Sequence, residues 1–230
     1  ATSIGEAVYV IVPSTNGCPG EPITVRVTVY PNPTVTANPT LQVLCSGETT
    51  SISLSSNVPG TTFTWTQTQT NLNGTNNGTG NLITDTLTVV NPASNGTVTY
   101  TITPIANGCS GNPIDVTVTV KPRPEVFGTP TSVICSGESS NVVLSPSPTA
   151  TTTTFTWTVQ QIGVTGASAG SGSFIDQILQ TTAQVQGTVI YTVTPTANGC
   201  SGNPIDITIT VNPLPVAQLQ DGIICVDQAT

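Results

Sequence analysis

The sequence lacks histidine and methionine altogether, and its three basic residues stand against 11 acidic ones. Without histidine, the commonest general base and imidazole metal ligand is missing. Three basic residues also cannot neutralise a phosphate backbone or bind an anionic lipid surface. We therefore expect no catalytic residues, no metal site, no cofactor and no nucleic-acid partner. No apolar run approaches the roughly 18 residues of a membrane-spanning helix, so direct membrane insertion is not expected either.

Aromatic residues make up only 4% of the chain. Glycan-binding surfaces usually expose several aromatic side chains together. We assign most aromatic residues to strand interiors, namely Phe63, Trp65, Tyr100, Phe155, Trp157 and Tyr191. Tyr9 and Tyr30 fall on the outward phase of their segments. The sequence therefore leaves no aromatic platform for carbohydrate.

What the chain does contain is a repeat. The segment "NGCSGNPI" occurs at 107–114 and again at 198–205, with a looser copy at 16–23. The cysteines in these segments recur every 91 residues, and a second cysteine series recurs every 90 residues. A repeat of this length can bury a core of its own. The period predicts the end of one repeat at 1–30, complete repeats at 31–121 and 122–212, and the start of another at 213–230, as in a fragment of a longer protein.

Each repeat alternates apolar and polar residues with a period of two. Val98, Tyr100 and Ile102 alternate with threonines, and the run 114–120 alternates in the same way after an Asn-Gly break. This pattern indicates half-buried strands joined in a hairpin. Short strands, frequent turns and one central tryptophan per repeat, Trp65 and Trp157, predict immunoglobulin-like β-sandwiches. The fold class is therefore all-β, with the sandwiches in an elongated array joined by stiff Pro-x-Pro linkers.

The six cysteines lack the C-x-x-C spacing and the histidines of zinc sites, which favours disulfides and a location outside the cytoplasm. One bridge per repeat would join Cys45 with Cys109 and Cys135 with Cys200, contributing about 4 kcal/mol. However, a sandwich places those two turns at opposite ends. The alternative bridges neighbouring repeats, Cys45 with Cys200. Its unpaired cysteines would then seek partners outside this chain: Cys18, Cys109, Cys135 and Cys225.

Acidic residues are scattered. Glu48 and Glu138 follow the two "CSG" segments at equivalent places, and Asp115 and Asp206 fall on the outward side of the last strand of each repeat. Calcium requires six to eight oxygen ligands, usually from several carboxylates. One or two acids at each junction are too few, so no calcium site is expected.

The segments "VLCSGETTSISLSS" at 43–56, "TTFTWT" at 61–66 and the run 98–124 resemble the PKD-like, immunoglobulin-fold repeats of Bacteroidota. Such repeats occur in tandem in very large secreted surface proteins, including gliding-motility adhesins exported by the type IX secretion system. The second repeat shares these motifs, whereas "IICVDQAT" at 223–230 departs from them.

This resemblance implies a non-catalytic, disulfide-braced spacer segment of a cell-surface adhesin or filament. Its partners would be neighbouring repeats and, beyond them, surface glycans or other cell-surface proteins. The alternative is a set of carbohydrate- or protein-binding accessory modules of a secreted enzyme. Asp85-Thr86-Leu87 also resembles the O-glycosylation sequence of exported proteins in that phylum, which makes Thr86 a candidate modification site.

Overall fold

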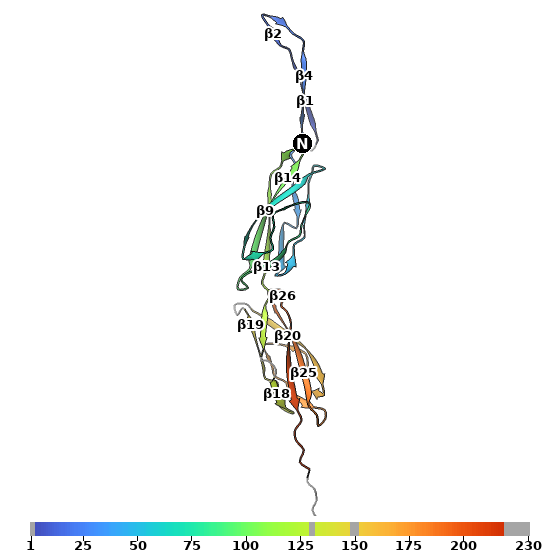
Figure 1. The fold of residues 1–230 in the computed structure, drawn as a ribbon, viewed down its shortest axis with the longest axis vertical. Helices are drawn as coiled ribbons and strands as arrows, with labels where there is room; N and C mark the ends of the chain where they lie inside the picture. The colour runs from blue at the N-terminus through green and yellow to red at the C-terminus, as the bar shows by residue number, and fades with distance from the viewer. Residues whose placement is uncertain (1–2, 129–131, 148–151, 219–230) are drawn as a thin grey trace, which may run out of the picture. The chain divides into compact units, whose positions relative to one another are not determined.

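The computed structural model describes residues 3–128, 132–147 and 152–218 (Figure 1). The chain divides into two compact units, 1–122 and 123–230, and each is described by itself. The regular elements of the described residues are all β-strands, which confirms the predicted all-β class. Within those residues no helix is long and apolar enough to cross a membrane.

The first unit begins with a hairpin. Strand β1 (Gly5–Ile11) pairs antiparallel with β4 (Ile23–Val29), and the short strands β2 (Ser14–Thr15) and β3 (Cys18–Pro19) close its tip. β1 and β4 form a two-stranded sheet of their own. Every side chain of β4 is exposed, so this hairpin carries no core.

The rest of the first unit is a two-layered sandwich. Its larger sheet has the order β11-β9-β14-β16-β6, and β15 pairs with the end of β14. The strands of this layer are β6 (Leu41–Cys45), β9 (Thr62–Thr70), β11 (Gly78–Thr79), β14 (Gly96–Ala106), β15 (Cys109–Ser110) and β16 (Ile114–Lys121). β6 runs parallel to β16, and the other pairs are antiparallel.

Two three-stranded sheets form the second layer, with the orders β12-β8-β5 and β10-β13-β7. Their strands are β5 (Thr36–Asn38), β7 (Glu48–Thr49), β8 (Ile52–Ser55), β10 (Leu72–Asn73), β12 (Leu82–Ile83) and β13 (Thr86–Val89). The core between the layers takes the inward residue of each alternation, such as Ile52 and Leu87 from one layer and Val98, Tyr100 and Ile102 from the other. The predicted half-buried strands are therefore confirmed.

The second unit repeats this architecture. Its larger sheet has the order β18-β27-β25-β20-β22, and β26 pairs with β25. As in the first unit, the parallel pair joins the first and last strands of this sheet along the chain, β18 and β27. The strands of this layer are β18 (Ser132–Cys135), β20 (Thr154–Ile162), β22 (Gly170–Ser171), β25 (Gly187–Ala197), β26 (Cys200–Ser201) and β27 (Ile205–Asn212). The facing strands are β17 (Glu125–Gly128), β19 (Val142–Ser147), β21 (Val164–Thr165), β23 (Phe174–Ile175) and β24 (Gln180–Thr181).

The two tryptophans occupy the centres of these cores, as predicted. Trp65 is 9% exposed and Trp157 is 7% exposed. Each indole N–H donates to a carbonyl of the loop after its strand, that of Asn76 (3.2 Å) or Ser168 (3.1 Å). Burial of the ring with its one polar atom satisfied is the usual state of a core tryptophan. The tryptophans are packing residues.

The prolines predicted to form stiff linkers are partly built into the repeats. Pro33 and Pro124 are buried. A Cβ atom on Gly111 would lie 1.8 Å from the Pro33 carbonyl oxygen, and one on Gly202 would lie 1.8 Å from that of Pro124. Only glycine permits this approach. The second proline of each pair is therefore fixed against the "CSGNP" turn of its own repeat.

Candidate functional site: the cysteine turns and a buried polar network

The first cysteine of each repeat lies in a turn that is tied to two strands. In the turn Cys45–Glu48, the Ser46 amide donates to the Lys121 carbonyl (2.8 Å), and the Gly47 amide donates to a carbonyl of β13 (2.7 Å). The Glu48 carboxylate accepts the Cys45 amide (2.9 Å). The second repeat makes the same contacts, Ser136 to Asn212 (2.8 Å), Gly137 to Leu179 (2.7 Å) and Cys135 to Glu138 (2.7 Å). This network fixes the cysteine beside the last residue of the final strand.

The second cysteine follows a two-residue hairpin loop. Ala106 pairs with Cys109, and the loop residues Asn107 and Gly108 have φ values of 50° and 79°. Two successive positive φ values mark the type I′ turn that Asn-Gly favours in tight hairpins. Asn198 and Gly199 repeat it, with φ values of 53° and 83°. The sequence prediction of this hairpin is confirmed.

The two turns lie at opposite ends of the large sheet. Cys45 pairs with Lys121 at one end, and Cys109 pairs with Ala106 at the other. The 11 residues of β14 separate the two ends. At about 3.3 Å per residue the separation is roughly 33 Å, whereas the Cα atoms of a disulfide lie within about 7 Å. A bridge within one repeat is geometrically impossible.

The states of the cysteines agree with this geometry. Cys18, Cys109 and Cys135 are free thiols, whereas Cys45 and Cys200 are each disulfide-bonded. Of the two alternatives for the pairing, the within-repeat bridges Cys45–Cys109 and Cys135–Cys200 are therefore excluded, because each would have to span the sheet and its partner is a thiol. Three of the six cysteines predicted to be oxidised are thiols here. Cys225 lies outside the described residues.

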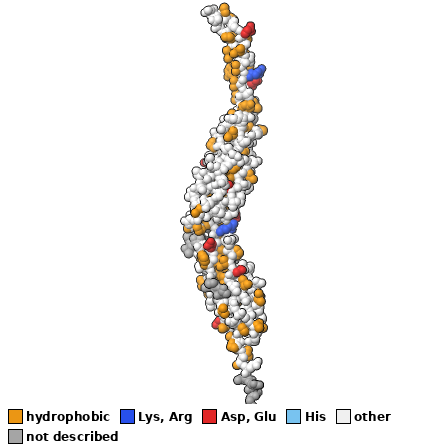
Figure 2. Space-filling model, in the orientation of Figure 1, with side chains coloured by type: hydrophobic (Ala, Val, Ile, Leu, Met, Phe, Trp, Pro, Cys, Tyr) orange, Lys and Arg blue, Asp and Glu red, His pale blue; other side chains and the backbone are white. Residues whose placement is uncertain are grey.

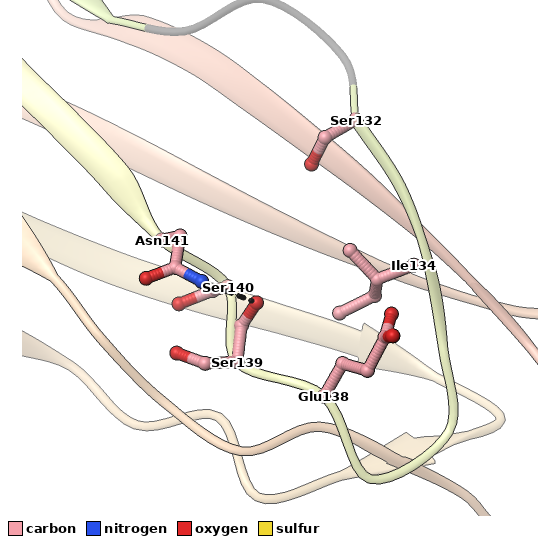
Figure 3. Close-up of a pocket in the computed structure, with 6 residues that line it drawn as sticks. All are labelled: Ser132, Ile134, Glu138, Ser139, Ser140 and Asn141. Carbon is pink, nitrogen blue, oxygen red and sulfur yellow. Dashed lines mark hydrogen bonds between the residues drawn. The ribbon is translucent and has the colours of Figure 1, made fainter.

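The acids next to the first cysteine serve the turn. Glu138 lines a surface hollow of about 470 Å³ with Ser132 and Ile134 on one wall and residues 139–141 on the other. Figure 3 shows its side chain directed toward Ile134. Glu138, like Glu48, accepts the amide of the preceding cysteine. Across the described segments no group of three or more metal-ligating side chains occurs.

A buried polar network, which the sequence reasoning missed, crosses the core of the first repeat. Asp85 is 8% exposed and accepts three hydrogen bonds. The donors are the Tyr100 hydroxyl (2.6 Å), the Asn76 amide (3.0 Å) and the Asn76 side chain (3.2 Å). Thr50, also buried, accepts the Asp85 amide (2.8 Å) and donates to the Ile83 carbonyl (3.0 Å). A buried carboxylate is tolerated only with such partners.

The second repeat has a neutral group at the same place. The Gln177 Oε1 atom accepts the Tyr191 hydroxyl (2.9 Å) and the Ser168 amide (3.0 Å). Its Nε2 atom donates to the Ser168 carbonyl (2.9 Å) and Oγ (3.0 Å). Ser140 replaces Thr50, accepting the Gln177 amide (3.0 Å) and donating to the Ile175 carbonyl (2.9 Å). The two networks occupy the same place in the fold but differ in charge and in the direction of one side-chain hydrogen bond.

The tyrosines respond to this difference. Burial raises the pKa of Tyr100 far above its ordinary value, and the hydrogen bond to Asp85 and the charge of that carboxylate raise it further. Burial also raises the pKa of Tyr191, while Ser140 acts in the opposite direction. In both repeats folding therefore favours the neutral phenol.

The remaining candidate residues lie on the surface. Thr86 is exposed on β13, between the buried side chains of Asp85 and Leu87, and its Oγ1 lies 2.8 Å from that of Thr49. Its modification remains a prediction. Asp115 and Asp206 are exposed as predicted, and each accepts a threonine hydroxyl of the neighbouring strand (2.7 Å).

A family model described as "PKD-like domain" matches residues 42–124 and 132–215, one copy in each sandwich. No curated protein matches the chain. The first repeat unit and the second are thus recognised separately by the same model, in agreement with their shared strand order.

Solved structures with similar folds include the insect immune protein hemolin, at 12% identity and a TM-score of 0.36 over 90% of this chain and 56% of that one. The fibronectin(III)-like modules of Clostridium thermocellum CbhA match at 13% identity and a TM-score of 0.34, over 82% of this chain and 100% of that one. Sidekick-1 immunoglobulin domains 1–5 match at 16% identity and a TM-score of 0.29, over 90% of this chain and 45% of that one.

Proposed function

Because the chain belongs to the PKD-like domain family, we propose that it is a non-catalytic structural segment of an extracellular surface protein, in which disulfides join successive repeats. PKD-like and immunoglobulin-like domains are usually extracellular and generally serve as adhesive or structural modules rather than as enzymes. The resemblance to the surface repeats of Bacteroidota favours an adhesin or filament exported by type IX secretion and used in adhesion or gliding. The segment acts as a spacer, and the neighbouring repeats are its principal partners.

The observation that carries this proposal is the place of each cysteine turn in its own repeat. Cys45 lies beside Lys121, the residue with which β16 ends. The Cys200 turn lies against the residues with which the second repeat begins, because Arg123 donates to the Ser201 carbonyl and Pro124 contacts Gly202. One cysteine is thus held at the exit of a repeat and the other at the entry.

Chain connectivity limits how far apart these two turns can lie. Lys121 and Arg123 are two residues apart, a reach of about 7.6 Å. Cys45 and Cys200 are each oxidised, and the partners offered by their own repeats are free thiols. We propose the bridge Cys45–Cys200, the alternative that the sandwich topology expected from the sequence also favours. It closes a covalent loop of residues 45–200 and ties the two repeats together beside the Pro122 junction, so it resists bending there.

If the exit cysteine of each repeat bonds the entry cysteine of the next, the positions of the other cysteines indicate their partners. Cys109 is held at the entry of its repeat, where Gly111 contacts Pro33, and Cys135 is held at an exit, where it pairs with Asn212. Each would form a disulfide with the complementary cysteine of an adjacent repeat. The free thiols of this chain are thus the open ends of a series of junction bridges.

Peptide mapping without reduction tests the proposal on the intact chain. We expect a linked peptide containing Cys45 and Cys200, with Cys109 and Cys135 accessible to alkylation. Cys200→Ser should expose Cys45 as a thiol, whereas the matched control Cys109→Ser should leave the bridge intact. A Cys45–Cys109 peptide, or a Cys45 that alkylates without reduction, would refute the junction bridge. Specific binding of the intact chain to a glycan array would instead favour accessory binding modules.

A further inference from the structure

The hairpin of residues 5–29 copies the last hairpin of each complete repeat. Gly5 pairs with Val29 and Ile11 with Ile23. Their equivalents 91 residues later, Gly96 with Val120 and Ile102 with Ile114, pair in the same register. The turns also agree, because Asn16 and Gly17 have φ values of 47° and 82°, close to those of Asn107 and Gly108.

The equivalence defines a buried phase for the hairpin. The hairpin face, as we call it, consists of Ala7, Tyr9, Ile11, Val25, Val27 and Val29. Its counterparts in the first repeat are all 0% exposed, namely Val98, Tyr100, Ile102, Val116, Val118 and Val120. Tyr9 is exposed, as predicted, although it occupies the position of the buried Tyr100.

The hairpin face is nevertheless uncovered. Tyr9 is 57% exposed, Ile11 48%, Val27 44% and Val29 56%. Figure 2 shows hydrophobic side chains gathered along this hairpin. An isolated two-stranded hairpin is at best marginally stable in water, and apolar patches of this kind mark interaction surfaces.

We propose that the hairpin face is a docking surface for the complementary part of a PKD-like repeat, with the strand content of residues 31–95. The described repeats show what such an occupant supplies. It adds a strand along the free edge of β1, as β9 does along β14, and a second layer over the face. It also supplies an acceptor for the Tyr9 hydroxyl, the role of Asp85 and Gln177.

This requirement excludes simpler occupants. One added strand would extend the sheet but leave the apolar hairpin face exposed to water. A second hairpin of the same kind would cover the face with apolar residues, yet its own inward phase carries no carboxylate or amide. A sandwich layer with an inward acceptor, such as Asp85 or Gln177, satisfies both the apolar and the polar groups.

The test places a copy of residues 31–95 before Gly5 in the full chain, so that the copied Asn95 leads into Gly5 as it leads into Gly96. The readout is amide hydrogen exchange of residues 5–29. In the unmodified chain we expect rapid exchange, and in the extended chain at least 10³-fold slower exchange, comparable to residues 96–120. The inference rests on the repeat array proposed above, but it is read separately from the Cys45–Cys200 peptide.

Val27→Asn provides the matched control. It should leave the unmodified chain unchanged, because its side chain is exposed there, and abolish the added protection in the extended chain. Unaltered exchange of residues 5–29 in the extended chain would overturn the inference. So would a concentration-dependent dimer of the unmodified chain that Val27→Asn dissolves, because the occupant would then be a second copy.

Discussion

The two repeats solve one problem in two ways. Both must bury a tyrosine hydroxyl in the core, and both place an acceptor two residues after an inward isoleucine. The first uses a carboxylate, Asp85, and the second an amide, Gln177. The loop residue opposite changes with it. Asn76 gives its side-chain N–H to Asp85, whereas Ser168 accepts from Gln177.

The difference teaches that the fold requires hydrogen-bond satisfaction at this position and not a particular charge. An aspartate can only accept, so its neighbour must donate; a glutamine also donates, so its neighbour must accept. The cost of burying a charge is met in the first repeat by three donors. Because each repeat contains a single tryptophan, Trp65 or Trp157, the unfolding of the two repeats can be followed separately.

The largest expected difference follows removal of the acceptor. Asp85→Ala leaves the Tyr100 hydroxyl and the Asn76 amide buried without a partner, and should lower the free energy of unfolding of the first repeat by about 3 kcal/mol. Gln177→Ala should cost the second repeat about 2 kcal/mol, because only neutral hydrogen bonds are lost. Denaturant unfolding followed by Trp65 in a Trp157→Phe background, and the reverse, measures both. An equal or larger loss in the second repeat would contradict this ranking.

The next largest difference between the repeats should be their loss of stability at alkaline pH. The pKa of Tyr100 is raised above that of the unfolded chain, so its contribution is complete below about pH 10 and is lost as the unfolded phenol ionises at higher pH. The first repeat should lose about 1 kcal/mol between pH 10 and 11 from this one group, and the second repeat less.

Unfolding of each repeat at pH 9, 10 and 11 measures this effect. Asp85→Asn is the control, because it removes the charge that helps to raise the pKa of Tyr100 while retaining an acceptor. Its alkaline loss should fall toward that of the second repeat. A steeper alkaline loss in the second repeat than in the first would be incompatible with the network described.

The smallest effect should be the same in both repeats. Thr50→Val and Ser140→Ala each remove a buried hydroxyl that accepts one amide and donates to one carbonyl. We expect a loss of about 1 to 2 kcal/mol in each repeat. Thermal unfolding of the two variants should agree within experimental error, whereas a clear inequality would show that the charge of Asp85 strengthens its neighbouring bonds.

Much of this fold could be predicted from the sequence. The alternation around Tyr100 placed its strand correctly, and the Asn-Gly pair placed the hairpin turn, because both signals are local. Asp85 could have been found in the same way, since Ile83, Asp85 and Leu87 share one phase and all three are buried. The acid was overlooked because charged residues are rarely fully buried.

The cysteine pairing depended on contacts between distant segments. The parallel pairing of β6 with β16, which places Cys45 beside Lys121, joins residues more than 70 positions apart, and no local pattern encodes it. The expected opposition of the two turns came from general sandwich topology and is confirmed. The equivalence of Tyr9 with the buried Tyr100 was missed because the short hairpin was not aligned with the complete repeats, where the phase is evident.

The central claim is that each junction between repeats carries one bridge, from an exit cysteine to an entry cysteine. Duplication of residues 31–212 within the chain creates one new junction, where Asn212 leads into a second Pro31. Non-reducing peptide mapping should then find Cys45–Cys200 in each copy and a new bridge between Cys135 of the first copy and Cys109 of the second. If those two cysteines remain thiols while the duplicated repeats are folded, the junction rule is contradicted.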